Sequence, residues 1–220
     1  MLLNKVIPSA KKYFPKLEIK FKNNSFLMKL LGILLFFNKS FLSSFTTTIG
    51  SSIYFPNKQF LQERGYFSFV TLMHELVHVY DSNKNPLFKF LYLFPQILAP
   101  FISLLFFVLS WKIVLPLVII ALLPSPAYFR SKYEKRGYFV SLYVIYHLSK
   151  RWKDYTMLNF YKEKYIKHFK GADYYFMSPF GNVEKEFDDM VSKIKSGGKP
   201  LDGELMVILD NLIHKFFYEE

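Results

Sequence analysis

Residues 66–80, with the sequence YFSFVTLMHELVHVY, decide how this chain folds. Apolar and aromatic side chains fill most of the positions, and Gly65 precedes the stretch while Asn85-Pro86 follows it. A glycine before and an Asn-Pro pair after a largely apolar stretch predict a helix that begins and ends near these residues. Because apolar side chains lie nearly all round this helix, we expect it to be buried. Its two histidines and its glutamate would then be buried with it.

The histidines and the glutamate form the pattern His-Glu-x-x-His, with His74, Glu75 and His78. Side chains four residues apart lie on one face of a helix, so both imidazoles can ligate a single Zn²⁺. Glu75 projects beside them and is close enough to take a proton from a metal-bound water. The alternative is a pair of hydrogen-bonded histidines inside a buried helix. The pattern favours a hydrolytic zinc site.

Asp81 lies seven residues after His74 and returns to nearly the same face of the helix. Two roles are open for its carboxylate. It can accept the second ring N–H of a ligating histidine and so fix the tautomer of that ring. It can also belong to a turn that ends the helix, because Asp81-Ser82-Asn83 is typical of such turns.

The composition of the chain limits the kinds of protein it can be. Of its 220 residues, 51% are hydrophobic, which suffices for one core or for one core plus a membrane segment. There is no cysteine, so disulfides, thiolate metal sites and cysteine nucleophiles are excluded. The net charge is +12, but the basic residues form no helical stripe or nucleic-acid motif. We therefore expect no nucleic-acid partner, and a single domain over residues 1–220, because no internal repeat is found.

Residues 87–124 form a long apolar stretch with only two charges, Lys89 and Lys112. Prolines interrupt it, and neither apolar half reaches the ~20 residues of a spanning helix. One arrangement is a single broken span over residues 97–123. The second is an inserted hairpin that dips into the membrane and returns, with Trp111 and Lys112 near its tip. The third is a buried helical hairpin in a soluble protein.

Basic residues flank this stretch on both sides. They are Lys84, Lys89, Arg130, Lys132, Lys135 and Arg136. Positive charge at both ends favours placing both ends on the cytoplasmic side of a membrane, which the hairpin satisfies and a single span does not. We therefore expect membrane association through the hairpin, at an anionic surface, with the site on the cytoplasmic side.

A catalytic zinc takes three protein ligands and leaves the fourth position for water. The next acidic residue after Asp81 is Glu134, which begins a long helical stretch. Arg130, Glu134 and Tyr138 are four residues apart and share one helix face, so Glu134 is the predicted third ligand. The alternative is an exposed Arg–Glu pair on a surface helix. His147 is another candidate for a ligand or a transition-state donor. It is kept as a minor one, because it lies about 140° from Glu134 around the helix.

Together these motifs resemble the HExxH zinc endopeptidases of the gluzincin type. They are most similar to the membrane-associated branch that contains the CAAX prenyl protease and the bacterial heat-shock membrane endopeptidase. In that branch the helix with the glutamate ligand also follows apolar segments, and Glu134 matches that ligand. Gly137 replaces a small alanine of the family, Arg130 lies one position from the family's arginine, and Tyr138 stands where the family has an aspartate. The resemblance covers residues 45–145.

A strand is predicted over residues 46–56, TTTIGSSIYFP, from its β-branched and aromatic content and its final proline. It resembles the edge strand that compact zincins place beside the active-site cleft, where an extended peptide can pair with it. Residues 26–37 are predicted as a buried or membrane-surface helix, and residues 150–220 as a helical subregion. The expected fold is α+β and mostly helical, zincin-like, with a small N-terminal sheet, an active-site helix and the inserted membrane-dipping hairpin.

These expectations combine into a zinc-dependent, membrane-associated endopeptidase that acts on a peptide or protein substrate. His74, His78 and Glu134 would hold Zn²⁺, and Glu75 would act as the general base. Tyr138 would hydrogen-bond the oxyanion that develops at the scissile carbonyl, and a tyrosine packed in the core is the alternative. The alternative function is a non-enzymatic membrane-bound structural or interaction protein with a structural or vestigial zinc site.

Overall fold

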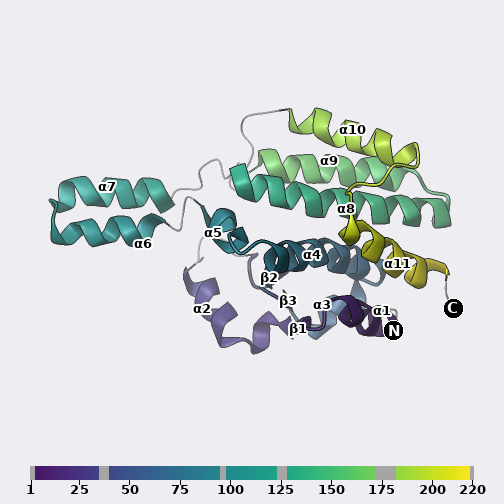
Figure 1. Ribbon diagram of the computed structural model, residues 1–220, viewed down its shortest axis with the longest axis horizontal. Coiled ribbons are helices and arrows are strands. Elements are labelled where there is room, and N and C mark those ends of the chain that lie inside the picture. Colours follow the sequence, from purple (N-terminus) through teal and green to yellow (C-terminus); the bar gives the residue numbers. More distant parts are fainter. Residues whose placement is uncertain (1–2, 35–39, 95–97, 123–127, 172–181, 219–220) are drawn as a thin grey trace.

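The computed structural model describes residues 3–34, 40–94, 98–122, 128–171 and 182–218 (Figure 1). These residues form a mostly helical protein with one small sheet, which confirms the predicted α+β class. The α-helices are α1 (Leu3–Tyr13), α2 (Phe26–Leu34), α3 (Lys58–Glu63), α4 (Tyr66–Lys84), α5 (Phe88–Leu93), α6 (Leu98–Ser103), α7 (Trp111–Leu122), α8 (Tyr128–Trp152), α9 (Thr156–Lys170), α10 (Val183–Lys195) and α11 (Glu204–Tyr218). Short 3₁₀ helices are η1 (Lys22–Asn24) and η2 (Leu104–Phe107).

The sheet is built from three short strands, β1 (Glu18–Phe21), β2 (Thr47–Ile49) and β3 (Ser52–Phe55). Their order is β1-β3-β2, with β1 parallel and β2 antiparallel to β3. The prediction of one strand over residues 46–56 is wrong, because the chain turns back at Gly50, where φ is +61°. Glycine adopts this left-handed conformation without steric cost. The sheet edge that contacts α4 is therefore the three-residue strand β2.

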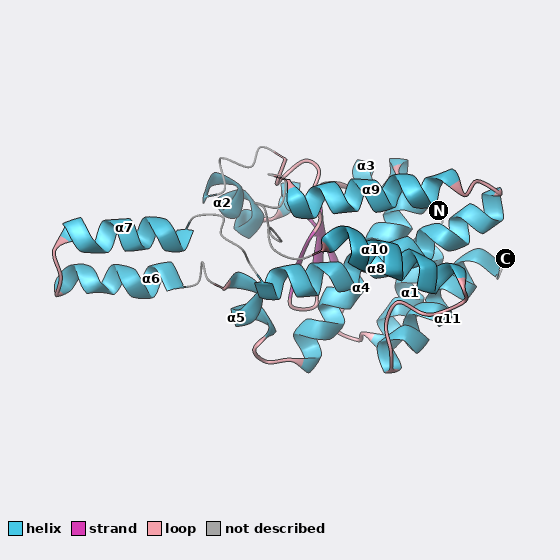
Figure 2. Ribbon diagram, turned by 90° about the horizontal axis from the view of Figure 1, so that it is seen from above, coloured by secondary structure: helices cyan, strands magenta, loops and turns pink. Residues whose placement is uncertain are grey.

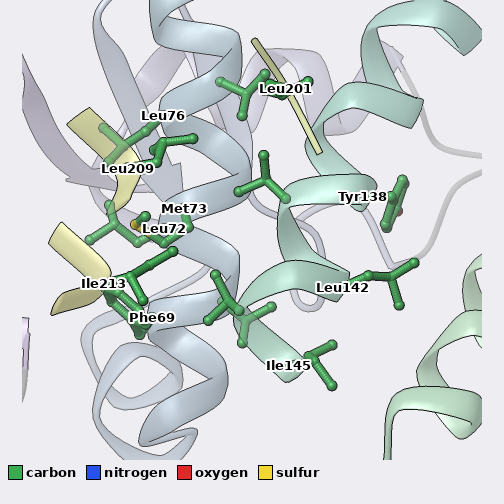
Figure 3. Close-up of a cluster of buried hydrophobic side chains, with 14 of the residues drawn as sticks. Phe69, Leu72, Met73, Leu76, Tyr138, Leu142, Ile145, Leu201, Leu209 and Ile213 are labelled. Carbon is green, nitrogen blue, oxygen red and sulfur yellow. The ribbon is translucent and has the colours of Figure 1, made fainter. Parts of the chain in front are cut away.

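Helix α4 lies between α8 and the sheet in Figure 1, and it also contacts α11. Figure 3 shows side chains from α4, α8 and α11 in one buried cluster. The buried apolar side chains of α4 are Phe69, Val70, Leu72, Met73, Leu76, Val77 and Val79. Full burial of each such side chain is worth roughly 1.5–3 kcal/mol. This burial confirms the prediction for α4 and holds the histidine-bearing helix rigidly in place.

Residues 98–122 form a helical hairpin that projects from the rest of the protein in both ribbon views (Figures 1 and 2). Helix α6 leads through η2 into α7, the two helices contact each other, and Trp111 begins α7 next to the turn. The fold-back confirms a hairpin and contradicts a single span over residues 97–123. Most of its large apolar side chains are exposed, so burial within this chain is contradicted as well. Among the described helices, none has the length and apolarity needed to cross a membrane.

Helix α2 covers most of the predicted 26–37 helix, whose last residues lie outside the described part of the chain. It is not buried as a whole, since Phe26 is 82% exposed and, of the α2 side chains whose burial the structure describes, only Met28 reaches the interior. The predicted helical character of residues 150–220 is confirmed in their described part. There α9 and α10 pack on α8, and α11 packs on α1 and α4.

Candidate metal centre

His74 and His78 lie one turn apart on α4, and both rings meet Glu134, which projects from α8. The Nε2 atoms of the two histidines are 3.1 Å apart. The carboxylate of Glu134 lies 3.3 Å from Nε2 of His74 and 3.6 Å from Nε2 of His78. All three side chains are buried. One donor atom from each residue lies within 4.8 Å of the others, so the group can hold a metal ion.

The spacing of these donor atoms fits a tetrahedral ion. Bonds of about 2.0–2.1 Å to zinc place neighbouring ligand atoms about 3.3–3.4 Å apart. The observed separations are 3.1 Å between the two Nε2 atoms, 3.3 Å from Nε2 of His74 to Oε2 of Glu134, and 3.6 Å from Nε2 of His78 to Oε1 of Glu134. The structure thus brings together all three predicted ligands in a group whose dimensions suit a small divalent cation.

Ser141, on α8, lies against the ring nitrogen of His74 that faces away from the group. Its hydroxyl donates to the carbonyl oxygen of Gly137 at 3.2 Å, and its Oγ lies 3.4 Å from Nδ1 of His74. With its own proton directed at the carbonyl, the hydroxyl accepts from Nδ1–H. We therefore assign the proton of neutral His74 to Nδ1, which leaves the Nε2 lone pair free to bind a cation.

Gly137 lets α8 approach His74 closely. A β-carbon at this position would lie 2.7–2.8 Å from the Cε1, Nδ1 and Nε2 atoms of the His74 ring. Real β-carbons essentially never make contacts under 3.0 Å, so any side chain here would displace the ring or the helix. The close approach of α4 and α8 therefore requires glycine at this position, where the resembling family has alanine.

Asp81 does not orient the second ligand histidine. The Nδ1 atom of His78 is buried and has no hydrogen-bond partner among the described residues. The Asp81 carboxylate instead accepts two hydrogen bonds from Arg136 on α8, of 3.0 and 3.1 Å. The first role predicted for Asp81 is therefore wrong, because helix packing brings a guanidinium against it. The helix itself ends three residues later, at Lys84.

Glu134 and His78 are strongly coupled. Burial opposes charge on both side chains, but their mutual attraction and hydrogen bonding outweigh it. The pKa of Glu134 is therefore held well below its ordinary value, and the pKa of His78 is raised to about 9. In the absence of a cation, a proton on His78 balances the carboxylate. A bound metal takes the place of such a proton, since histidine ligates in its neutral form.

Glu75 is buried beside the group but contributes no donor atom to it. Its Oε2 accepts a hydrogen bond of 2.6 Å from the hydroxyl of Thr48 on β2. This contact ties the carboxylate to the sheet edge, and the same carboxylate is close enough to His78 to help raise its pKa. The structure therefore provides a second, non-ligating carboxylate next to the ligands, as the motif predicts.

Lys22 is a neighbour of Glu75 that no sequence pattern indicates. It is fully buried, and its Nζ donates to the carbonyl oxygen of Phe41 at 2.6 Å and lies 3.9 Å from the centre of the Phe41 ring. Burial lowers the pKa of Lys22 to about 8, and the attraction of Glu75 partly opposes this shift. In the sequence it is one of 29 basic residues, and only its position in the fold distinguishes it.

Tyr92, on α5, is a second residue that the sequence does not reveal. Its hydroxyl donates to Oε1 of Glu134, and its ring centre lies 6.0 Å from that of His78. Arg130 holds this tyrosine by donating from Nε to the Tyr92 carbonyl oxygen at 3.2 Å and by lying over the Tyr92 ring at 5.4 Å. Arg130 thus supports Glu134 through Tyr92.

Tyr138 lies with its ring edge against His74, the ring centres being 4.7 Å apart. The same ring packs on Tyr165 and Phe169 in the core. Both of the roles considered for Tyr138 therefore stay open, and its part in oxyanion binding stays a prediction.

His147 does not join the metal-binding group. It lies 13 residues after Glu134 on α8, or about 20 Å along the helix axis. Its Nδ1 is 3.4 Å from the hydroxyl of Tyr218, and its ring stacks on Phe217 of α11. The prediction of His147 as a minor ligand candidate is wrong.

Comparisons with protein-family models, with curated proteins and with solved structures find no match to this chain. The chemistry of the group of buried side chains is therefore the basis on which its function is inferred.

Proposed function

We propose that this protein is a zinc-dependent endopeptidase, with His74, His78 and Glu134 as the metal ligands. The observation that carries the proposal is the combination of three buried donor atoms with a fourth side chain, Glu75, that is adjacent but not a ligand. Three protein ligands leave one position of a tetrahedral zinc for water, whereas a structural site closes all four. A neighbouring carboxylate without a ligand role is what water activation requires.

The donor set favours zinc over magnesium and calcium. Two imidazoles and one carboxylate are a ligand set of catalytic zinc, while magnesium and calcium prefer oxygen ligands alone. The tautomer assigned to His74 and the close approach at Gly137 direct the ring toward the cation. When bound, zinc would acidify a coordinated water and polarise the scissile carbonyl.

Glu75 is the proposed general base. Thr48 occupies its Oε2, so Oε1 is the atom that would take the proton of the nucleophilic water and return it to the leaving amine. Lys22 is buried near this carboxylate, whose attraction partly opposes the lowering of the Lys22 pKa by burial. Tyr138 would donate a hydrogen bond to the carbonyl oxygen as charge develops on it.

Strand β2 is the proposed binding edge for the substrate. Among the described residues it pairs with β3 on one side only, and its Thr48 already contacts Glu75. An extended peptide that adds to the free side of β2 would lie beside the general base. This geometry supports hydrolysis within a peptide chain, as the resemblance to the HExxH endopeptidases also implies.

The test compares wild type with Glu75→Gln and Glu134→Ala. We expect about one zinc per wild-type chain, full zinc but no peptide hydrolysis in Glu75→Gln, and loss of zinc in Glu134→Ala. Mass spectrometry measures the metal, and a quenched-fluorescent peptide library measures hydrolysis. Glu63→Gln, at an exposed position on α3, is the matched control and should behave as wild type. Normal hydrolysis by Glu75→Gln would refute the mechanism, and zinc without any hydrolysis in wild type would favour the non-enzymatic alternative.

A further inference from the structure

The exposed surface of the hairpin α6–η2–α7, residues 98–122, is almost entirely apolar. Phe107 is 88% exposed, Val108 80% and Trp111 61%. The exposed large apolar side chains of the hairpin are Phe101, Leu104, Leu105, Phe106, Phe107, Val108, Leu109, Trp111, Ile113, Leu115, Leu117, Ile119 and Ile120. Such a continuous apolar surface is larger than soluble monomers normally expose, so it requires something to cover it.

The distribution of these side chains around α7 indicates what covers it. With 100° per residue, the exposed positions from Trp111 to Ile120 extend over about 240° of the helix circumference. The remaining sector holds Val114 and Ala121, which are buried, and it faces α6. A protein partner or a second copy would need one apolar face. Apart from Lys112 near the turn, the surface is apolar on every side not covered by α6. Such a surface fits a solvent that surrounds it, namely lipid acyl chains.

The length of the hairpin matches half a bilayer. Helix α7 has 12 residues, which corresponds to about 18 Å at 1.5 Å per residue. The hydrocarbon core of a bilayer is about 30 Å thick, so one leaflet contributes about 15 Å. The hairpin is therefore long enough to fill one leaflet and to return on the side from which it entered.

The charges around the hairpin identify the lipid headgroups. No aspartate or glutamate occurs from residue 82 to residue 133, whereas this interval contains five basic residues, Lys84, Lys89, Lys112, Arg130 and Lys132. All but Lys112 lie before or after the hairpin in the chain, and Lys89 and Lys132 are exposed. Positive charge at the base of an inserting segment is attracted to anionic headgroups. Lys112 near the tip opposes insertion, but it is one charge against thirteen exposed apolar side chains.

We propose that this hairpin inserts into one leaflet of an anionic membrane and holds the body of the protein at the lipid surface. The hydrogen bond from Tyr92 to Glu134 joins the chain segments that precede and follow the hairpin. The metal-binding group therefore lies at the hairpin's base, next to the headgroups. If the proposed peptidase function holds, its substrates are peptide segments at the membrane surface.

The two tryptophans of the chain allow a direct test with vesicles of phosphatidylcholine and phosphatidylglycerol in equal parts. Trp152→Phe leaves Trp111 in the hairpin as the single probe. Trp111→Phe leaves Trp152, which packs on Tyr66 far along α8, as the matched control. We expect vesicles to shift the emission of Trp111 to shorter wavelength, and lipids brominated deep in their acyl chains to quench most of it. The emission of Trp152 should not change. Unchanged Trp111 emission, or quenching of both tryptophans alike, would overturn the proposal.

Further measurements separate lipid from other occupants. A shift of Trp111 emission with rising protein concentration, in the absence of lipid, would indicate a second copy and contradict the proposal. Equal binding to vesicles of phosphatidylcholine alone would contradict the role of anionic headgroups. A variant with residues 98–122 replaced by a glycine-serine loop should lose vesicle binding. Its zinc content and its hydrolysis of soluble peptides report on the proposed function separately, so failure of one proposal is distinguishable from failure of the other.

Discussion

Replacement of Gly137 by alanine tests the close contact between α8 and His74. In a helix interior, alanine is more favourable than glycine by about 1 kcal/mol, so without the contact the variant would be more stable. The new β-carbon would lie 2.7–2.8 Å from the His74 ring, and it must move by about 1 Å to reach an ordinary carbon contact distance. Overpacking of this kind costs about 1–3 kcal/mol. We therefore expect a net loss of stability of about 0–2 kcal/mol in the metal-free protein.

The larger effect should fall on the metal. Moving the His74 ring turns Nε2 away from His78 and Glu134, whose donor atoms now lie 3.1 and 3.3 Å from it. Disturbing the groups that orient a ligand typically costs 10–100-fold in metal affinity, and we expect Gly137→Ala to lose about 100-fold. Competition with a fluorescent zinc chelator measures the dissociation constant, and urea denaturation with excess chelator measures the stability of the metal-free protein.

Gly32→Ala is the matched control for this experiment. A β-carbon there would also lie close to a neighbour, 2.8 Å from Cδ1 of Leu42, but that neighbour is the end of a half-exposed flexible side chain. We expect Gly32→Ala to be neutral or more stable, with unchanged zinc affinity. Wild-type zinc affinity in Gly137→Ala, together with a stability gain of about 1 kcal/mol, would refute the claim that this contact sets the position of His74.

Three further substitutions test the neighbours of the site. Ser141→Ala removes the acceptor for Nδ1–H of His74 and should weaken zinc binding about 10-fold; an unchanged dissociation constant in chelator competition would contradict the assigned tautomer. Tyr92→Phe keeps the ring but removes the hydrogen bond to Glu134, and the same assay should again show a loss of about 10-fold. Lys22→Met tests a buried charge. Burial lowers the pKa of Lys22 from 10.5 to about 8. Between pH 8 and pH 10.5 the unfolded chain therefore binds more protons than the folded protein, so the free energy of unfolding of the wild type should rise by about 3 kcal/mol over this range. Urea denaturation across this range should show a smaller rise in Lys22→Met, and parallel curves would show that Lys22 is not the group responsible.

The elements that depend on local pattern could be predicted from the sequence. The apolar content of residues 66–80 predicts the buried helix α4, and the four-residue spacing of His74 and His78 predicts that their rings share a face. The two short apolar halves of residues 87–124 leave a broken span and a hairpin open, and the basic residues at both ends favour the hairpin. Glu134 could be named as the third ligand candidate because it is the first acidic residue after Asp81, with no aspartate or glutamate from residue 82 to residue 133.

The partners of these residues depended on how the helices pack, which the helical period does not specify. The period shows which side chains share a face, but not which face of a second helix meets them or at what distance. Asp81 therefore pairs with Arg136, while Ser141 and Tyr92 contact the predicted ligands. Burial of Lys22 near Glu75 and the close contact at Gly137 likewise arise from packing between segments far apart in the chain. The sequence was sufficient to name the three side chains that form the group, and the tertiary structure was required for everything that orients them.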